Sequence, residues 1–253
     1  MLFLKKAPIG KYVKRLLVLD LSWTIIEIPI IVNNYFILSD DSLLLSCINL
    51  LKGFLWGETY LGSWFIHASW MGMLIVNYVF KVPKWLQFMI CILCFVMALV
   101  DTSYYFFIVD IGMKGVWESL NRVIYPSESF IVAIPYLLVG KYIADNKETD
   151  ISKYSTPILL LSVVMLLVEA EFCRLCSIPI LADMANPRYE VFILLPIIAL
   201  LLVKISINYK MPISNKASKY LRNMSILIYL FHRISLIFIH KLGIEPEGYY
   251  ISL

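Results

Sequence analysis

Five titratable side chains interrupt the apolar stretches of this sequence, where ionisable groups are uncommon. Asp20 and Glu27 fall in LLVLDLSWTIIEIPIIV (residues 16–32), His67 in YLGSWFIHASWMGMLIVNYVF (60–80), and His232 and Arg233 in MSILIYLFHRISLIFIH (224–240). At about 1.5 Å of rise per residue, Glu27 lies about 17 Å beyond residue 16, and His232 about 13 Å beyond residue 223. Both depths are near the centre of a hydrocarbon layer about 30 Å thick, where an ionisable group is costly and normally functional.

The spacing in the first stretch places its polar side chains on one helix face. Asp20, Trp23, Thr24 and Glu27 fall at i, i+3, i+4 and i+7. A carboxylate on such a face suits a cavity wall, where it acts as a general base or as an acid kept partly protonated by burial. The alternative is structural, because Glu27 also suits an interhelical hydrogen bond or an ion pair with Arg233. The sequence leaves both interpretations open.

Polar side chains follow helical spacing in the other two stretches as well. They are Tyr60, Ser63, His67, Trp70 and Asn77 in the second stretch, and Ser225, Tyr229 and His232 in the last. An imidazole titrates near neutral pH and is able to take a proton from a hydroxyl group, so both histidines are candidate bases. For His67, a substrate contact and a packing histidine fit the sequence equally well. Trp64 suits either a lumen or an aromatic belt at a membrane surface.

The composition indicates an integral membrane protein. The chain has 253 residues, of which 60% are hydrophobic and 16% charged, and its mean hydropathy is +0.80. Apolar stretches recur along the whole length, so residues 1–253 are predicted to form one membrane domain. The net charge of +4 implies no nucleic-acid partner. Cys91 and Cys94 are predicted to pack inside an apolar helix, whereas Cys173 and Cys176 are placed in a polar connection that suits free thiols better than a disulfide or a metal.

Hydropathy predicts an all-α, polytopic bundle of about seven transmembrane helices. Their expected ranges are 16–36, 59–80, 85–108, 129–144, 155–170, 189–206 and 223–241. A shorter run at 42–57, interrupted by Lys52 and Gly53, is predicted to be an interfacial or re-entrant helix. Lys and Arg gather in the connections 1–15, 81–84, 141–154 and 204–222. The positive-inside rule then places the N-terminus in the cytoplasm and the C-terminus outside.

Four segments, in chain order, resemble landmarks of the acyltransferase-3 family of bacterial multi-pass membrane proteins, especially the branch that O-acetylates polysaccharides. KYVKRLLVLDLSW (11–23) resembles the basic segment before the family's third helix. LGSWFIHASWMGMLIVNYVFK (61–81) is similar to its leucine-tryptophan-phenylalanine helix through Trp64 and Phe65. FIVAIPYLLVGKYIA (130–144) resembles its helix ending in leucine-glycine-tyrosine, and SILIYLFH (225–232), with Tyr229 and His232, resembles the signature of its penultimate helix.

The resemblance implies an O-acyltransferase of the cell envelope, located in the bacterial cytoplasmic membrane. Such an enzyme moves an acyl group, commonly acetyl, from a cytoplasmic acyl-CoA to a hydroxyl of an exported polysaccharide or lipid-linked glycan. Lys11, Lys14 and Arg15, here called the basic cluster, would bind the phosphates of the donor. Positive-inside topology explains the same cluster equally well. Acetyl-CoA is expected as a donor substrate. No bound cofactor or metal is expected, and the other expected partners are the glycan acceptor and membrane lipids.

The resemblance assigns no catalytic residue in these 253 positions, because the family's catalytic histidine belongs to a first helix without a counterpart here. Residues predicted to line the cavity or position the substrate are His232, Tyr229, Arg233, Glu27, His67 and Trp64. The chain is therefore expected to be either an acyltransferase completed by a further segment or an incomplete, inactive form. The alternative function is a non-enzymatic transport or assembly component of a polysaccharide export system.

Overall fold

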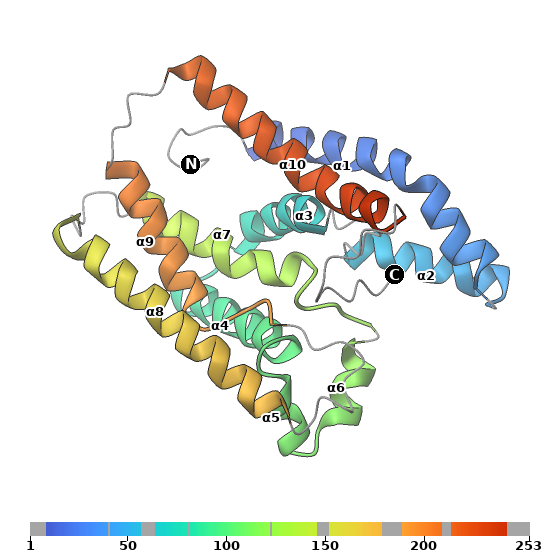
Figure 1. Cartoon of the computed structure of the whole chain (residues 1–253), viewed down its shortest axis with the longest axis horizontal. Coiled ribbons are helices and arrows are strands. Elements are labelled where there is room, and N and C mark those ends of the chain that lie inside the picture. Colours follow the sequence, from blue (N-terminus) through green and yellow to red (C-terminus); the bar gives the residue numbers. More distant parts are fainter. Residues whose placement is uncertain are drawn as a thin grey trace.

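The computed structural model describes residues 9–39, 41–56, 64–79, 81–121, 123–145, 152–178, 189–208 and 214–241, and every regular element in these ranges is helical (Figure 1). Inside these ranges, the side chains of residues 34, 144–145, 152–154, 207–208, 215–216, 219, 222, 232–234 and 236–241 are not described. The elements are α1 (Ile9–Val32), the π-helix η2 (Asn33–Ile37), α2 (Leu43–Trp56), α3 (Trp64–Val79), α4 (Lys84–Asp101), α5 (Tyr105–Asp110), α6 (Lys114–Asn121), α7 (Phe130–Asp145), α8 (Ser152–Ser177), α9 (Leu195–Asn208) and α10 (Asn215–Lys241). The all-α prediction is confirmed for the described residues.

Hydropathy located the helices well. The seven predicted ranges fall, in order, on α1 with η2, α3, α4 with α5, α7, α8, α9 and α10. The short run at 42–57 forms α2, which passes through Lys52 and Gly53 without a break.

The predicted helix 85–108 is wrong in one respect, because it breaks between α4 and α5. The Thr102 hydroxyl donates a hydrogen bond to the carbonyl of Ala98 at 2.9 Å, and the Thr102 backbone leaves the helical region at φ −126°. A hydroxyl that bonds the carbonyl one turn earlier competes with the regular helix ladder. This break creates a corner that apolar periodicity does not reveal.

The number of membrane crossings is less well supported than the positions of the helices. In the described part of the chain, two segments are both long and apolar enough to cross a membrane: Ile9–Ile37 and Lys84–Asp101. Helices α3, α7 and α9 have 16, 16 and 14 residues, fewer than the roughly 20 that a spanning helix needs. Helix length and hydropathy therefore do not support seven crossings.

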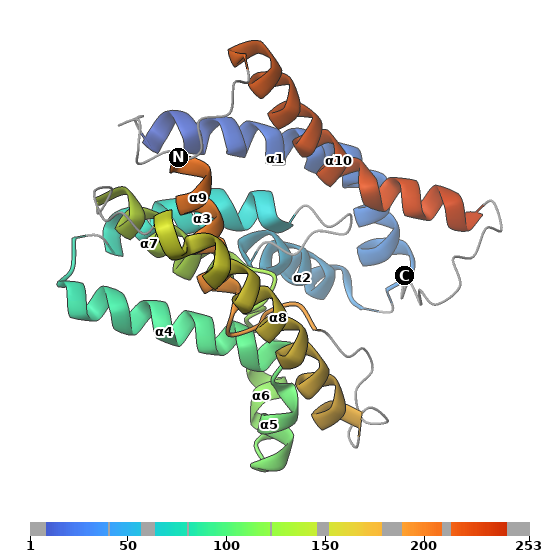
Figure 2. The same cartoon turned by 60° about the vertical axis from the view of Figure 1, so that its left-hand side comes forward.

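Helices α3 and α7 lie in the middle of the bundle. Helix α1 packs on α3, α7 packs on α3 and α4, and α8 packs on α9. Figures 1 and 2 both show α10 crossing beside α1 on one side of this central pair, with α4 and α8 on the other. A Cβ atom at Gly72 of α3 would lie 3.1 Å from Cβ of Ala133 and 3.1 Å from Cδ1 of Leu137 on α7. The absence of a side chain at Gly72 thus allows the two central helices to approach closely.

Large apolar side chains cover much of the outer surface. The exposed fractions are 67% for Ile25 on α1, 73% for Leu44 on α2, 62% for Leu93 on α4 and 64% for Leu161 on α8. A soluble monomer rarely exposes apolar patches of this extent, whereas a lipid-facing or protein-facing surface does. The interior of the bundle, by contrast, holds several polar side chains.

Candidate functional site

Helix α1 turns a partly polar face toward α3. Its buried residues are Val13, Asp20, Trp23 and Glu27, and Asp20 and Glu27 are only 2% and 1% exposed. The predicted shared face of Asp20, Trp23 and Glu27 is confirmed. Thr24 lies at its edge, half-buried, and donates its hydroxyl to the backbone carbonyl of Asp20 at 2.9 Å.

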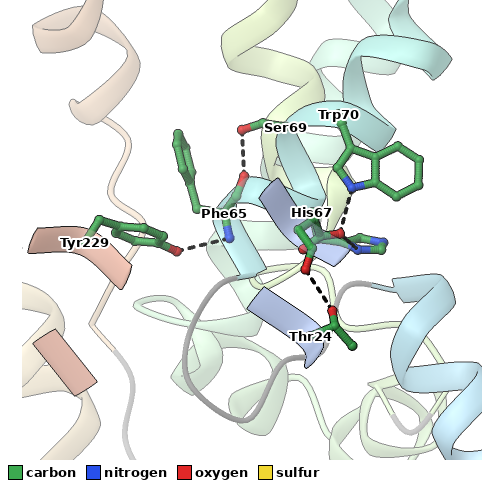
Figure 3. A network of polar contacts seen from close by, with 7 residues as sticks. Thr24, Phe65, His67, Ser69, Trp70 and Tyr229 are labelled. Atoms are coloured by element: carbon green, nitrogen blue, oxygen red, sulfur yellow. Dashed lines mark hydrogen bonds and ion pairs between the residues drawn. The ribbon is translucent and has the colours of Figure 1, made fainter. Parts of the chain in front are cut away.

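The centre of the site is the carboxylate of Asp20. One of its oxygens, Oδ2, lies 2.9 Å from Nδ1 of His67 and accepts a hydrogen bond from Nε1 of Trp70, also at 2.9 Å (Figure 3). With Asp20 ionised, the carboxylate only accepts hydrogen bonds, and Nδ1 of His67 is then the donor. His67 and Trp70 are both donors on one face of α3, at i and i+3, and Asp20 is the acceptor that both reach.

The other ring nitrogen of His67 has a different environment. Nε2 is buried and has no hydrogen-bond partner in the described part of the chain, and the same holds for Nε1 of Trp23 on α1. The His67 ring meets the edges of Phe54 (centroids 5.4 Å apart) and Trp70 (4.8 Å). With Nδ1 protonated, Nε2 presents a lone pair, while Trp23 presents an N–H donor. A buried polar atom without a partner costs about 1–3 kcal/mol, so each marks a place suited to a polar ligand group or a water.

Helix α10 completes the enclosure of the site. The backbone N–H of Phe65, in the first turn of α3, donates to the hydroxyl oxygen of Tyr229 at 3.2 Å (Figure 3). Leu230 packs with Trp23 and Ile66, and α10 therefore contacts both α1 and α3. Tyr229, predicted to line the cavity, thus lies on a helix that contacts α3, and its role in a cavity stays a prediction.

The remaining predicted site residues are Trp64, which packs in another cluster, and two residues whose side chains are not described. The side chains of His232 and Arg233 lie outside the described residues, so their roles and the Glu27–Arg233 pair stay predictions. Trp64 is half-buried and packs against the cluster that contains Leu99 of α4 and Val132 of α7.

The basic cluster lies at the start of α1, where Lys11, Lys14 and Arg15 are all exposed. Arg15 precedes Asp20 by five residues, which is about 7.5 Å of helix rise. Val13, between Lys11 and Lys14, packs on Trp70 and Met73 of α3. The cluster is thus exposed on α1, on a different side from the buried residues Val13 and Asp20.

The two cysteine pairs have different outcomes. Cys91 and Cys94 pack against the core formed by Val76, Ile134 and Leu138, as predicted. Cys173 and Cys176 do not lie in a polar connection: both are free thiols inside the continuous helix α8, and Cys173 is fully buried. The prediction failed there because Glu169, Glu171 and Arg174 made the second half of α8 resemble a loop.

Sequence reasoning selected Glu27 and not Asp20 as a candidate site residue, and the role of Glu27 stays a prediction. It preferred Glu27 because of its central depth and treated Asp20 only as a neighbour on the same face. The useful signal was the pair of donors on α3, His67 and Trp70 at i and i+3, which requires a buried acceptor on the facing helix. The contact of Phe54 with the His67 ring could not be predicted, because the sequence indicated α2 only as an interfacial or re-entrant helix.

No family model, curated protein or solved structure matches this chain.

Proposed function

We propose that this chain is a multi-pass membrane O-acyltransferase that resembles the acyltransferase-3 family. It transfers an acyl group, most simply acetyl, from a cytoplasmic acyl-CoA to a hydroxyl of an exported polysaccharide or lipid-linked glycan. The single observation that carries the chemistry is the buried pair of Asp20 and His67, in which the carboxylate orients one ring nitrogen and the other has no partner. The same pairing orients the general base of hydrolases and transferases that act on acyl groups.

A membrane location is supported by the exposed apolar side chains of α1, α2, α4 and α8. Two helical segments meet the requirements for crossing, and we extend the proposal to seven crossings with α2 at the interface. Basic residues in alternate connections then put the N-terminus in the cytoplasm of a bacterial cell. In that orientation the basic cluster faces the cytoplasm, where the phosphates of an acyl-CoA are available to it.

The proposed reaction uses Nε2 of His67 as the base. As the acceptor hydroxyl attacks the acyl carbonyl carbon, Nε2 takes the hydroxyl proton and the carbonyl oxygen becomes an oxyanion. We assign the oxyanion donor to the indole N–H of Trp23, which is buried without a partner on the face of α1 that carries Asp20. Collapse of the tetrahedral intermediate breaks the carbon–sulfur bond, and the departing CoA thiolate takes the proton from His67. Asp20 keeps the imidazole in one tautomer and favours the imidazolium that forms transiently.

The proposal is tested by measuring O-acetyl groups on the surface polysaccharide of cells that express the full chain or its variants. His67→Gln keeps a polar side chain but removes the base, and we expect it to lower the acylation rate by about 10²- to 10⁴-fold. Ser69→Ala is the matched control, because Ser69 is two residues away on α3 and its hydroxyl bonds only the carbonyl of Phe65. Wild-type acylation by the His67 variant would remove this residue from the mechanism. Absence of gene-dependent acylation, with the protein present in the membrane, would refute the function itself.

A second function is favoured by the depth of His67, which is 2% exposed and enclosed by Phe54 and Trp70. In this alternative the Asp20 cluster fixes α1 on α3, and the chain is a non-enzymatic transport or assembly component of polysaccharide export. Deleting the gene would then reduce the amount of exported polysaccharide without changing its acyl content per sugar.

A further inference from the structure

A second set of buried polar atoms without partners belongs to residues 101–121 of the described structure. They are Oδ1 of Asp101, Oγ of Ser103, Nε1 of Trp117 and Oδ1 of Asn121. Ser103 is fully buried. Each such atom carries a desolvation cost that a bound polar group would remove. Their concentration in one short part of the chain therefore indicates a site rather than isolated packing defects.

All four residues belong to the corner in which α4 passes into α5 and α6. The chain turns from α4 into α5 at residues 102–104, reverses at Gly112 (φ +73°), and returns through α6. The Tyr105 hydroxyl donates to Oε1 of Glu118 at 3.4 Å, which joins the start of α5 to α6 next to Trp117. Trp117 and Asn121 lie four residues apart, on one face of α6. The open end of this helical hairpin is thus adjacent to the turn that carries Ser103.

Asp101 is held in place from the other side of the corner. Its Oδ2 accepts hydrogen bonds from the backbone N–H of Ser127 at 3.2 Å and from the Ser127 hydroxyl at 2.6 Å. Ser129, two residues later, accepts a bond from the N–H of Ile131 and caps the start of α7. One carboxylate oxygen of Asp101 is therefore committed to structure, and the other remains for a ligand.

The four atoms combine acceptors with a donor. Asp101 and Asn121 offer acceptor oxygens, Trp117 offers only an N–H, and the Ser103 hydroxyl is able to do either. A metal ion would find oxygen ligands here but would be repelled by the indole N–H. An alcohol hydroxyl both donates and accepts, and several hydroxyls on one ligand would satisfy all four atoms. This mixture fits a saccharide.

The corner borders the Asp20–His67 site through shared packing. Trp64, one turn before His67, packs in the same cluster as Ala98 and Leu99 at the end of α4, and Tyr104 joins that cluster. Figures 1 and 2 show the end of α4 running directly into the α5–α6 corner. The corner and the helix that carries His67 are thus linked by one packed cluster.

We infer that the corner formed by Asp101, Ser103, Trp117 and Asn121 binds the hydroxyl groups of a saccharide. Given the proposed function, this saccharide is the part of the acyl acceptor adjacent to the reacting hydroxyl. Binding requires the Trp117 and Asn121 side chains to rotate, because the four polar atoms are buried in the free protein. Helix α6 buries none of its residues and so offers little resistance to this movement.

Saturation-transfer difference titration of the purified full chain in detergent tests the inference, with chitotriose and maltotriose as probes and no acyl donor present. Asp101→Asn retains an oxygen for Ser127 and replaces the free acceptor by an NH₂ group. We expect it to weaken binding of the preferred trisaccharide at least tenfold. Trp117→Phe removes the indole N–H but keeps an aromatic ring on a helix without buried residues, and it is expected to weaken binding as well. Asp110→Asn is the matched control, because it makes the same change on the exposed end of α5.

The inference is overturned if neither trisaccharide binds the wild type saturably, or if both Asp101→Asn and Trp117→Phe bind like the wild type. Equal weakening by Asp110→Asn would also overturn it, because the effect would then be one of general charge. His67→Gln separates this result from the proposed function, since it is expected to bind the trisaccharide normally while losing acylation. Normal trisaccharide binding without any gene-dependent acylation would refute the proposed function and leave the binding site standing.

Discussion

Replacing Asp20 by alanine should reveal how much of the contact between α1 and α3 depends on one carboxylate. The substitution leaves two buried donors, Nδ1 of His67 and Nε1 of Trp70, without their acceptor. Single interhelical hydrogen bonds in membrane proteins contribute about 0.6 kcal/mol on average and at most about 1.7 kcal/mol. Two such bonds therefore give an expected loss of about 1–3 kcal/mol in the free energy of unfolding. Asp20→Asn retains an acceptor oxygen and should lose less.

The assay is sodium dodecyl sulfate titration of the purified chain in mixed micelles, read out by loss of helical structure. Trp70→Phe removes one of the two donors, so in that background Asp20→Ala should cost about 0.6–1.7 kcal/mol less than in the wild type. Ser22→Ala on the exposed face of α1 is the control, and we expect it to stay within about 0.5 kcal/mol of the wild type. Strict additivity of the Asp20 and Trp70 changes would refute the shared acceptor.

Three further substitutions have expected outcomes. Gly72→Val forces methyl groups against α7 and should destabilise the bundle by about 1–3 kcal/mol in the same titration. Gly140→Ala is the control, because its Cβ would lie in open space, and it should be neutral or stabilising. Equal effects of the two changes would contradict the close approach of α3 and α7. Reversing the charges of the basic cluster should raise the acyl-CoA concentration needed for half-maximal acylation without changing the amount of protein in the membrane, and an unchanged concentration dependence would exclude donor binding there. Neutralising Glu27 and Arg233 singly should lower thermal stability, and the double change should recover part of the loss if the two residues pair.

Sequence periodicity predicted the helices but not their breaks. Apolar side chains recur wherever a helix needs a hydrophobic surface, so the positions of α1, α3, α4, α7, α8, α9 and α10 followed from hydropathy alone. The break at Thr102 depends on a single hydroxyl that bonds the carbonyl of Ala98, and the hydrophobic pattern is the same on both sides of it. The charged residues near Cys173 led to the opposite error, in which the last part of α8 was predicted to be a connection. A helix end that carries exposed polar groups has the composition of a loop.

The candidate site was predictable in its residue types but not in its pairing. Sequence spacing placed Asp20 and Glu27 on one face of α1 and His67 with Trp70 on one face of α3. Which carboxylate meets which donor depends on the relative height of the two helices, and that is set by contacts such as Val13 on Trp70 and Met73. These contacts come from residues more than fifty positions apart in the chain, so local patterns carry no information about them.

The arrangement of the three polar features suits a reaction that takes its substrates from opposite sides of a membrane. The basic cluster lies at the start of α1, and Asp20 follows Arg15 by about 7.5 Å of helix rise. In the proposed topology, α4 ends on the outer side at Asp101, whereas His67 contacts Asp20, between one and two turns along α1 from the basic cluster. A donor held by the basic cluster and an acceptor held at the α4–α5–α6 corner would therefore approach the imidazole from opposite ends. Since a buried base without such access from both sides could serve only packing, the two binding surfaces are the features that distinguish a transferase from a structural bundle.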